Sequence, residues 1–258
     1  MKILLLCLVC ATSLSIAMPV FAWGDDCKYS RELEREVSLA GSSNIVVVAG
    51  AGALKIKGDK KRTAVLIQAK LCSQDESQLA DMNVNSGLES GALRIETVFA
   101  NEKSWSLGNN TASIDLVVYV PASAELNVGD SSGEAYVSGV ASLDMVDSSG
   151  ELTIESIAGD VKVKDSSGSL NIDEVAGSVW VTDSSGGIEV TSVIGDFTVE
   201  VDSSGSIEAN NVGGNVLVRV DSSGSIDVSD VGGDFIVGKD SSGGIRHDNV
   251  SGEVRLPE

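Results

Sequence analysis

The sequence DSSG occurs seven times in the second half of this 258-residue chain. The seven aspartates follow one another at intervals of 17, 18, 18, 19, 19 and 19 residues. An internal period of about 20 residues is typical of solenoids, in which each repeat buries its apolar face only by stacking on its neighbours. The aspartates are Asp130, Asp147, Asp165, Asp183, Asp202, Asp221 and Asp240, and the glycines that close each motif are Gly133, Gly150, Gly168, Gly186, Gly205, Gly224 and Gly243.

The residues between successive motifs have the periodicity of β-strands. In the unit that begins at Asp202, apolar side chains occupy alternate positions at Val216, Val218 and Val220, and the same offsets recur in other units. Alternation with a period of two, rich in Val and Ile, indicates two strands in each unit. Equivalent residues of successive units form stacked columns only if each strand pairs in parallel with its equivalent one unit later. The sequence predicts an all-β chain, a single right-handed parallel β-solenoid (β-helix) of 17–19-residue coils with two short strands per coil.

Each unit has two corners, one at DSSG and one at a turn half a unit later that reads VGGN, VGGD, VIGD or IAGD. We expect glycine to supply the positive φ that such corners need. An aspartate that opens a turn accepts hydrogen bonds from the backbone N–H groups that follow it, here those of the second serine and the glycine. We therefore expect the stacked aspartates to be satisfied by their own backbone and to need no metal. The alternative is a row of calcium ions, but calcium takes about six to eight oxygens and one carboxylate per coil is a thin supply.

The N-terminal half of the chain is less regular. Residues 1–22 combine a positive start, an apolar run and small residues at a cleavage site, which predicts a secretory signal peptide and an exported protein. Residues 23–126 contain strand-like segments and are predicted to form irregular coils and a cap, continuous with the regular solenoid of residues 127–258. No later apolar run is long enough for a membrane span. Cys27 and Cys72 are predicted to form a disulfide in an oxidising compartment, with free or metal-binding thiols as the alternative.

Charge and motif content limit the possible functions. The formal net charge of −20 argues against binding to nucleic acid or to an anionic membrane, since both need a basic face. The best candidate for catalysis is an outward column of Glu189, Glu208 and Asp227 that ends in Arg246. We interpret this column as a solvated face on which Arg246 relieves the last acid, and His247 as an end-cap in the final coil. We therefore predict no catalytic residues, no metal site and no cofactor.

One outward column carries apolar side chains on an otherwise acidic particle. It contains Trp180, Thr198, Leu217 and Ile236, which alternate with inward Val and Phe residues. Such a stripe is either a contact surface for a partner or a surface covered by the chain's own N-terminal segment, for example residues 32–39. The sequence leaves both interpretations open.

The repeated DSSG, the segment ALKIKGD and the segment IDLVVYVPASAELNV together resemble a known bacterial group over roughly residues 35–256. This group is the exported adhesin-like β-strand-repeat family of unknown function, related to the head domain of proteins provisionally named autotransporter adhesins. The resemblance implies a β-helix in the bacterial envelope.

The function predicted from these observations is an exported, non-catalytic structural or interaction module, periplasmic or at the cell surface. It would bind an envelope protein or glycan along a strand face, and it could form a homo-oligomer. The alternative is a carbohydrate-active β-helix enzyme that uses the acidic column.

Overall fold

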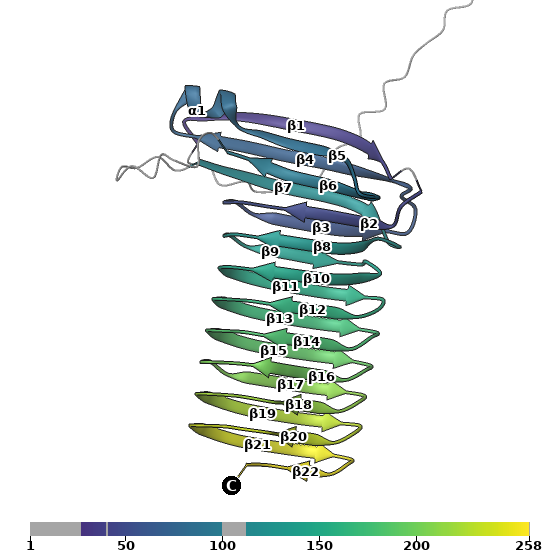
Figure 1. Ribbon diagram of the computed structural model, residues 1–258, viewed down its shortest axis with the longest axis vertical. Coiled ribbons are helices and arrows are strands. Elements are labelled where there is room, and N and C mark those ends of the chain that lie inside the picture. Colours follow the sequence, from purple (N-terminus) through teal and green to yellow (C-terminus); the bar gives the residue numbers. More distant parts are fainter. Residues whose placement is uncertain (1–26, 40, 100–111, 258) are drawn as a thin grey trace, which may run out of the picture.

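The computed structural model describes residues 27–39, 41–99 and 112–257, so the predicted signal peptide lies outside the described residues. The chain forms two 11-stranded sheets that face each other and are joined at both edges into a flattened column (Figure 1). The single described helix, α1 (Glu76–Asp81), begins at Asp75, whose side chain accepts a 2.8 Å hydrogen bond from the backbone N–H of Ser77.

Each sheet runs the length of the column. In the first, sheet A, the order is β1 (Tyr29–Ser38), β4 (Ala64–Ser73), β7 (Ala112–Pro121), β3 (Leu54–Asp59), β9 (Ala135–Ser138), β11 (Gly150–Ile157), β13 (Gly168–Val175), β15 (Gly186–Val193), β17 (Ile207–Val212), β19 (Gly224–Val231) and β21 (Gly243–Val250). In the second, sheet B, the order is β22 (Val254–Arg255), β20 (Phe235–Val237), β18 (Val216–Val218), β16 (Phe197–Val201), β14 (Val179–Thr182), β12 (Val161–Lys164), β10 (Ser142–Asp147), β8 (Glu125–Asp130), β2 (Asn44–Val48), β6 (Ala92–Val98) and β5 (Asn83–Glu89).

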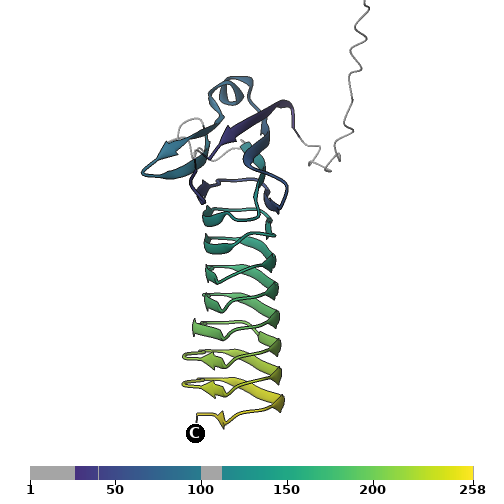
Figure 2. The same cartoon turned by 90° about the vertical axis from the view of Figure 1, so that its right-hand side faces the viewer.

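From β8 onward, each strand pairs in parallel with its equivalent one coil later. Thr153 pairs with Asn171 in sheet A, and Lys162 pairs with Trp180 in sheet B. The coils stack without interruption to the C-terminal end, as Figure 2 shows from the side. The parallel β-solenoid predicted from the repeat is confirmed.

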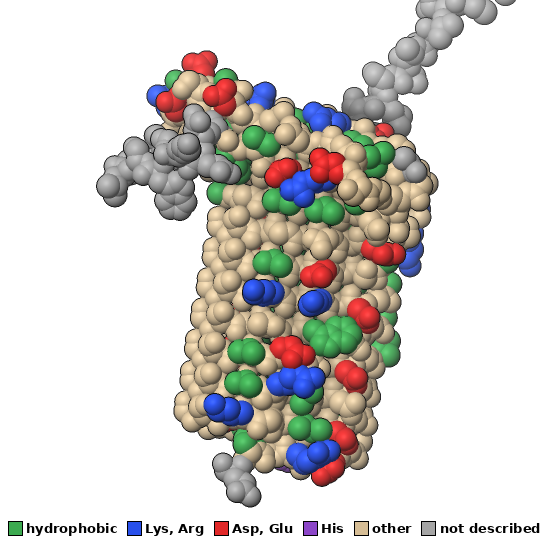
Figure 3. Space-filling model, viewed as in Figure 1, with side chains coloured by type: hydrophobic (Ala, Val, Ile, Leu, Met, Phe, Trp, Pro, Cys, Tyr) green, Lys and Arg blue, Asp and Glu red, His purple; other side chains and the backbone are tan. Residues whose placement is uncertain are grey.

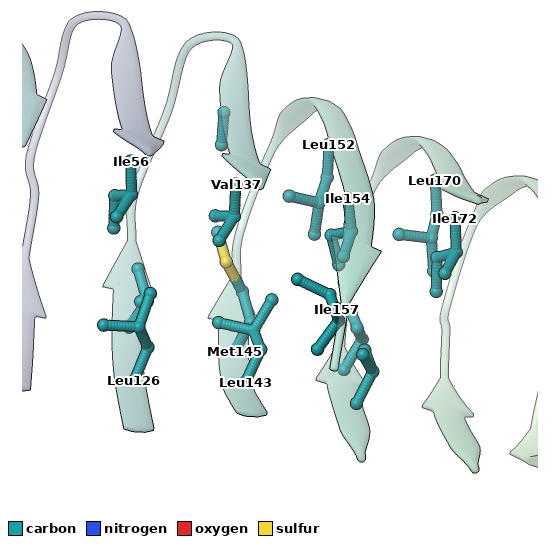
Figure 4. Packing of buried hydrophobic residues seen from close by; sticks show 14 of the residues in the cluster. Ile56, Leu126, Val137, Leu143, Met145, Leu152, Ile154, Ile157, Leu170 and Ile172 are labelled. Carbon is teal, nitrogen blue, oxygen red and sulfur yellow. The ribbon is translucent and has the colours of Figure 1, made fainter. Parts of the chain in front are cut away.

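The core lies between the two sheets and consists of the inward side chains of every coil. Strand β12 alternates buried and exposed residues, and both Ile154 and Ile172 are buried from the opposite sheet. Figure 4 shows inward side chains of the two sheets, such as Val137 and Leu143, pointing toward one another across the narrow interior. Since burying one such aliphatic side chain contributes about 1.5–3 kcal/mol, the stability grows with the number of stacked coils.

The two corners of each coil use glycine for different reasons. At the DSSG corner the glycines have positive φ, for example 141° at Gly205, as expected. At the other corner the positive φ belongs to Gly139 in the first regular coil and to non-glycine residues in the later coils, such as Ser156 at 56°, so the expected role of the glycines in the later turns is wrong. A glycine is needed at this corner because the coils approach closely: a Cβ on Gly177 would lie 2.5 Å from the carbonyl carbon of Gly159.

The N-terminal part departs from the expected parallel winding. Strands β2 and β3 do form a coil in parallel register with β8 and β9. Strand β4, in contrast, is antiparallel to both β1 and β7, and β5 and β6 form an antiparallel pair. Parallel winding, expected for most of residues 40–256, is thus interrupted in this region, where the sequence predicts irregular coils and a cap. Strand β1 forms the outer edge of sheet A, and its exposed Glu and Arg side chains disfavour pairing with another chain.

Cys27 and Cys72 form a disulfide with a Cα–Cα distance of 5.4 Å, which confirms the predicted pairing. The bridge fastens the chain just before β1 to the neighbouring strand β4. Intact-mass measurement of the exported protein before and after reduction should show a gain of two hydrogens. A thiol-alkylating reagent should label neither cysteine in the unreduced, denatured protein, and labelling of either one would contradict the pairing.

Candidate functional site

The predicted contact stripe lies in one straight column on the outer face of sheet B. Trp180, Thr198, Leu217 and Ile236 stand on β14, β16, β18 and β20, and each pairs directly with the next in parallel register. They point outward because the residues that alternate with them, such as Val179 and Val181, are fully buried.

The exposure of the stripe is moderate. Trp180, Leu217 and Ile236 are half-buried, whereas Thr198 is only 7% exposed and offers little surface. The segment of residues 32–39, which could have covered the stripe, lies instead in and just after β1, at the edge of sheet A. On the face seen in Figure 3, hydrophobic side chains occur as separate spots between charged side chains of both signs. The stripe is thus a mixed surface and not a large apolar patch.

A shallow hollow of about 740 Å³ adjoins Trp180 on the same outer face. Its rim continues the column along the sheet: Lys162 pairs with Trp180, Asp144 with Lys162, and Asn127 with Asp144. An indole ring, an ammonium group, a carboxylate and an amide therefore follow one another at the spacing of neighbouring strands, about 4.8 Å. The sequence analysis missed Asn127 and Asp144, although each stands three residues before a DSSG aspartate, as Trp180 and Lys162 do.

The DSSG corners place the aspartates inside the column. All are buried except Asp240, which is half-exposed. Asp183 Oδ1 accepts hydrogen bonds from the backbone N–H groups of Ser184 at 2.7 Å and Ser185 at 3.3 Å, so the donors are the two serines, not the second serine and the glycine. The hydroxyl of Ser185 donates to the carbonyl of Ser166 in the preceding coil, at 3.2 Å, and ties the corners together.

The second carboxylate oxygen of most of these aspartates has no hydrogen-bond partner. Within the described part of the chain, Oδ2 of Asp147, Asp165, Asp202 and Asp221 is buried without a hydrogen-bond partner, as are both oxygens of Asp130. The expectation that the backbone alone satisfies the aspartates is therefore wrong for these atoms. A buried carboxylate oxygen without a partner is costly, so the group responds by holding a proton more tightly.

The pKa values of the buried aspartates follow from this environment. Burial, reinforced by the charge of Asp147, raises the pKa of Asp130 from its ordinary value of 3.8 to about 7. Burial, with the charges of Asp183 and Asp221, raises the pKa of Asp202 to about 6. The pKa values of the remaining buried aspartates are raised in the same direction, with burial as the main cause: Asp147, Asp165, Asp183 and Asp221.

The acidic column considered for catalysis lies on the outer face of sheet A. Glu189, Glu208, Asp227 and Arg246 follow one another in register on β15, β17, β19 and β21. Arg246 donates hydrogen bonds to both carboxylate oxygens of Asp227, at 3.0 and 3.2 Å, which confirms the interpretation that it relieves the last acid. His247 in the final coil is exposed, and its ring centre lies 6.1 Å from that of Phe235.

The described residues contain no group of three or more His, Cys, Asp or Glu side chains that could hold a metal ion. In the same part of the chain, no helix has the length and the apolar character needed to cross a membrane.

Comparison with known proteins finds distant similarity to solved structures. No family profile and no curated protein sequence match the chain. Among solved structures, a protein of Clostridium sporogenes provisionally named a cell adhesion protein is 13% identical, with a TM-score of 0.40 over 78% of this chain and 99% of that one. A provisionally named lipid binding protein of Parabacteroides distasonis is 18% identical, with a TM-score of 0.44 over 88% and 97%. A provisionally named adhesin of Bacteroides fragilis is 11% identical, with a TM-score of 0.42 over 87% and 96%.

Proposed function

We propose that this chain is an exported, non-catalytic binding module of the bacterial envelope, adhesin-like in kind, which holds a glycan or protein partner against the outer face of sheet B. The observation that carries this proposal is the position of Trp180, half-buried at the rim of a hollow on an otherwise flat strand face. Export is supported by the signal-like residues 1–22 and by the disulfide, which persists in an oxidising compartment.

The composition of the hollow favours a glycan. The ring face of Trp180 can pack against the C–H groups of a sugar, while Lys162, Asp144 and Asn127 offer donors and acceptors for its hydroxyl groups. Each group stands on a strand, so the row is rigid and loses little entropy on binding. A protein interface would instead need a wider apolar centre than the single hydrophobic side chains on this face provide.

The geometry supports binding more than catalysis. General acid catalysis needs a carboxyl group that is protonated near neutral pH and within reach of the substrate. The carboxyl groups with strongly raised pKa, Asp130 and Asp202, lie inside the column where no substrate reaches them. Glu189 and Glu208 are on the surface, but they stand on a flat strand face and the 17–19-residue coils leave no loops to wall off a cleft.

The test compares two double variants in glycan-array and envelope pull-down experiments. Trp180→Ala with Leu217→Ser removes the stripe, and we expect binding to fall at least tenfold, because about 25 cal/mol is lost per Å² of apolar contact removed. Glu189→Gln with Glu208→Gln alters the outer face of sheet A in the same part of the column and should leave binding unchanged.

The outcomes separate the alternatives. Full retention of every partner by the Trp180 and Leu217 variant would refute the proposed surface. If the wild type still captures a protein after the extract has been deglycosylated, the partner is recognised through its protein part. Glycan cleavage by the wild type that disappears in the Glu189 and Glu208 variant would establish the enzyme.

A further inference from the structure

The seven DSSG aspartates form a continuous file inside the solenoid, here called the aspartate file. Asp130 and Asp147 are direct partners in the register of sheet B, and bridges link Asp202 to Asp221 and Asp221 to Asp240. Neighbouring coils lie about 4.8 Å apart, so each aspartate between the two ends of the file has one aspartate in the coil above it and one in the coil below. The members of the file that are fully interior are less than 5% exposed.

The surroundings of the file contain little that could neutralise it. At its N-terminal end the next coil reads Ala49-Gly50-Ala51-Gly52, and the pairing of Ala51 with Ser132 places Ala49 where an aspartate would otherwise continue the file. The inward side chains of sheet A that face the interior are apolar, such as Leu152 and Ile154.

Titratable groups near the file include the aspartates themselves, two lysines and one histidine. The charges that raise the pKa values of five members belong to their neighbours within the file; these members are Asp130, Asp147, Asp183, Asp202 and Asp221. Lys164 and Lys239 immediately precede two of the aspartates, but their side chains are exposed on the outer face. His247, the one titratable side chain at an inward position of sheet A in the last coil, is also exposed.

The buried carboxylate oxygens without a hydrogen-bond partner, here called the orphan oxygens, indicate which ligand the file can bind. Each gap between coils offers the carboxyl oxygens of two aspartates, and the serine hydroxyls beside them already donate to carbonyls of the preceding coil, as Ser167 does to Ser148 at 3.1 Å. Calcium requires about six to eight oxygens. A proton requires one donor and one acceptor oxygen, which two stacked carboxyl groups supply.

We propose that the aspartate file is a proton-binding site, in which protons taken up in mildly acidic solution are shared between the carboxyl groups of neighbouring coils as O–H···O⁻ hydrogen bonds. Each shared proton gives a partner to the two oxygens that it joins, and it removes the repulsion between two like charges at the same time. The file then stabilises the stacked coils in its protonated form and loosens them when it ionises.

The dependence on pH has a definite sign. The pKa of Asp130 is about 7 and that of Asp202 about 6 in the folded protein, against an ordinary value of 3.8. The folded chain therefore binds more protons than the unfolded chain between pH 4 and pH 7. The contribution of the file to stability is complete below about pH 4 and is lost as the pH rises through the folded pKa values.

The experiment measures urea unfolding of the whole chain between pH 4 and pH 8. In the wild type, these two groups should make the decimal logarithm of the unfolding equilibrium constant rise by about 1.7 between pH 5 and pH 6. The variant Asp130→Asn with Asp202→Asn, which resembles the neutral acid, should lose this slope and be more resistant to urea than the wild type at pH 8. The control Asp81→Asn with Asp248→Asn removes two exposed charges and should keep the wild-type slope.

Three results would overturn the proposal. The first is that the Asp130 and Asp202 variant retains the full dependence of the unfolding constant on pH. Another is a rise in the urea midpoint of the wild type on adding calcium at pH 7, which a chelator reverses, since that would make the file a metal site.

The third comes from the infrared spectrum of the folded wild type at pH 6, which tests the proposal even if the variants do not fold. It should contain the carbonyl stretch of protonated carboxyl groups, which disappears on titration to pH 9, and its absence would refute proton binding.

Discussion

Replacing Gly186 with alanine is expected to prevent the central coils from stacking, at a cost on the order of 5 kcal/mol in the free energy of unfolding. Gly186 has a φ of 143°, which an L-residue with a Cβ rarely adopts. A Cβ at this position would lie 1.6 Å from the carbonyl oxygen of Gly168 in the preceding coil. That oxygen belongs to a backbone fixed by its own parallel pairing, so neither side can move without breaking the register. Urea denaturation followed by circular dichroism measures the loss.

The adjacent residue provides the matched control. Gly187 has no positive φ, and the nearest atom to an added methyl group would be the flexible Oγ of Ser206, at 3.6 Å. Gly187→Ala should therefore change the free energy of unfolding by less than about 1 kcal/mol. Equal stability of the two variants would show that the DSSG glycines do not stack as described.

Replacing Phe197 with alanine is expected to cost about 3–5 kcal/mol. The side chain is fully buried in β16, between Val179 of the preceding coil and Val216 of the following one. Its removal leaves a cavity in the middle of the column, where coils on both sides hold the backbone in place and limit collapse. Phe197→Leu, which keeps most of the volume, should cost less than half as much.

Phe235 tests whether the position in the column matters. It is also fully buried and occupies the same inward column, but on its C-terminal side β20 pairs only with the short strand β22, where the partly buried Val254 lies beside Phe235. In a solenoid each coil interacts only with its neighbours. Phe235→Ala should therefore increase hydrogen exchange in the last coils and lower global stability less than Phe197→Ala does. Equal global losses would mean that the whole column unfolds as one unit.

The repeat allowed the solenoid to be predicted because every coil meets the same environment. The offsets that align Trp180 with Leu217 and Ile236 in the sequence also align them in the sheet. The same repetition identified the DSSG corner and its glycines. Local pattern and global structure coincide in such a fold, so register could be obtained by counting residues.

Features that break the repetition could not be obtained in this way. The corner formed by residues 49–52 continues the glycine column, with Gly52 at a φ of 132°, but it has alanine where the motif has aspartate. The antiparallel β5 and β6 pair arises only in the cap. The partnerless second oxygen of Asp165 depends on burial, and a sequence shows neither which way a turn side chain points nor how many donors reach it.

The position of the coil formed by β2 and β3 affects the order in which the chain can assemble. This coil lies between β6 and β7 on one side and β8 and β9 on the other, although β4 to β7 are made after it. Strand β8 can dock only on β2, whereas each later coil needs only the one completed just before it. We expect the distant contacts of the cap to be the slowest to close, because the contacts between later coils span only about 20 residues or fewer. Once the cap has formed, the rest of the column can wind up coil by coil in the direction of the chain, without waiting for its C-terminal end.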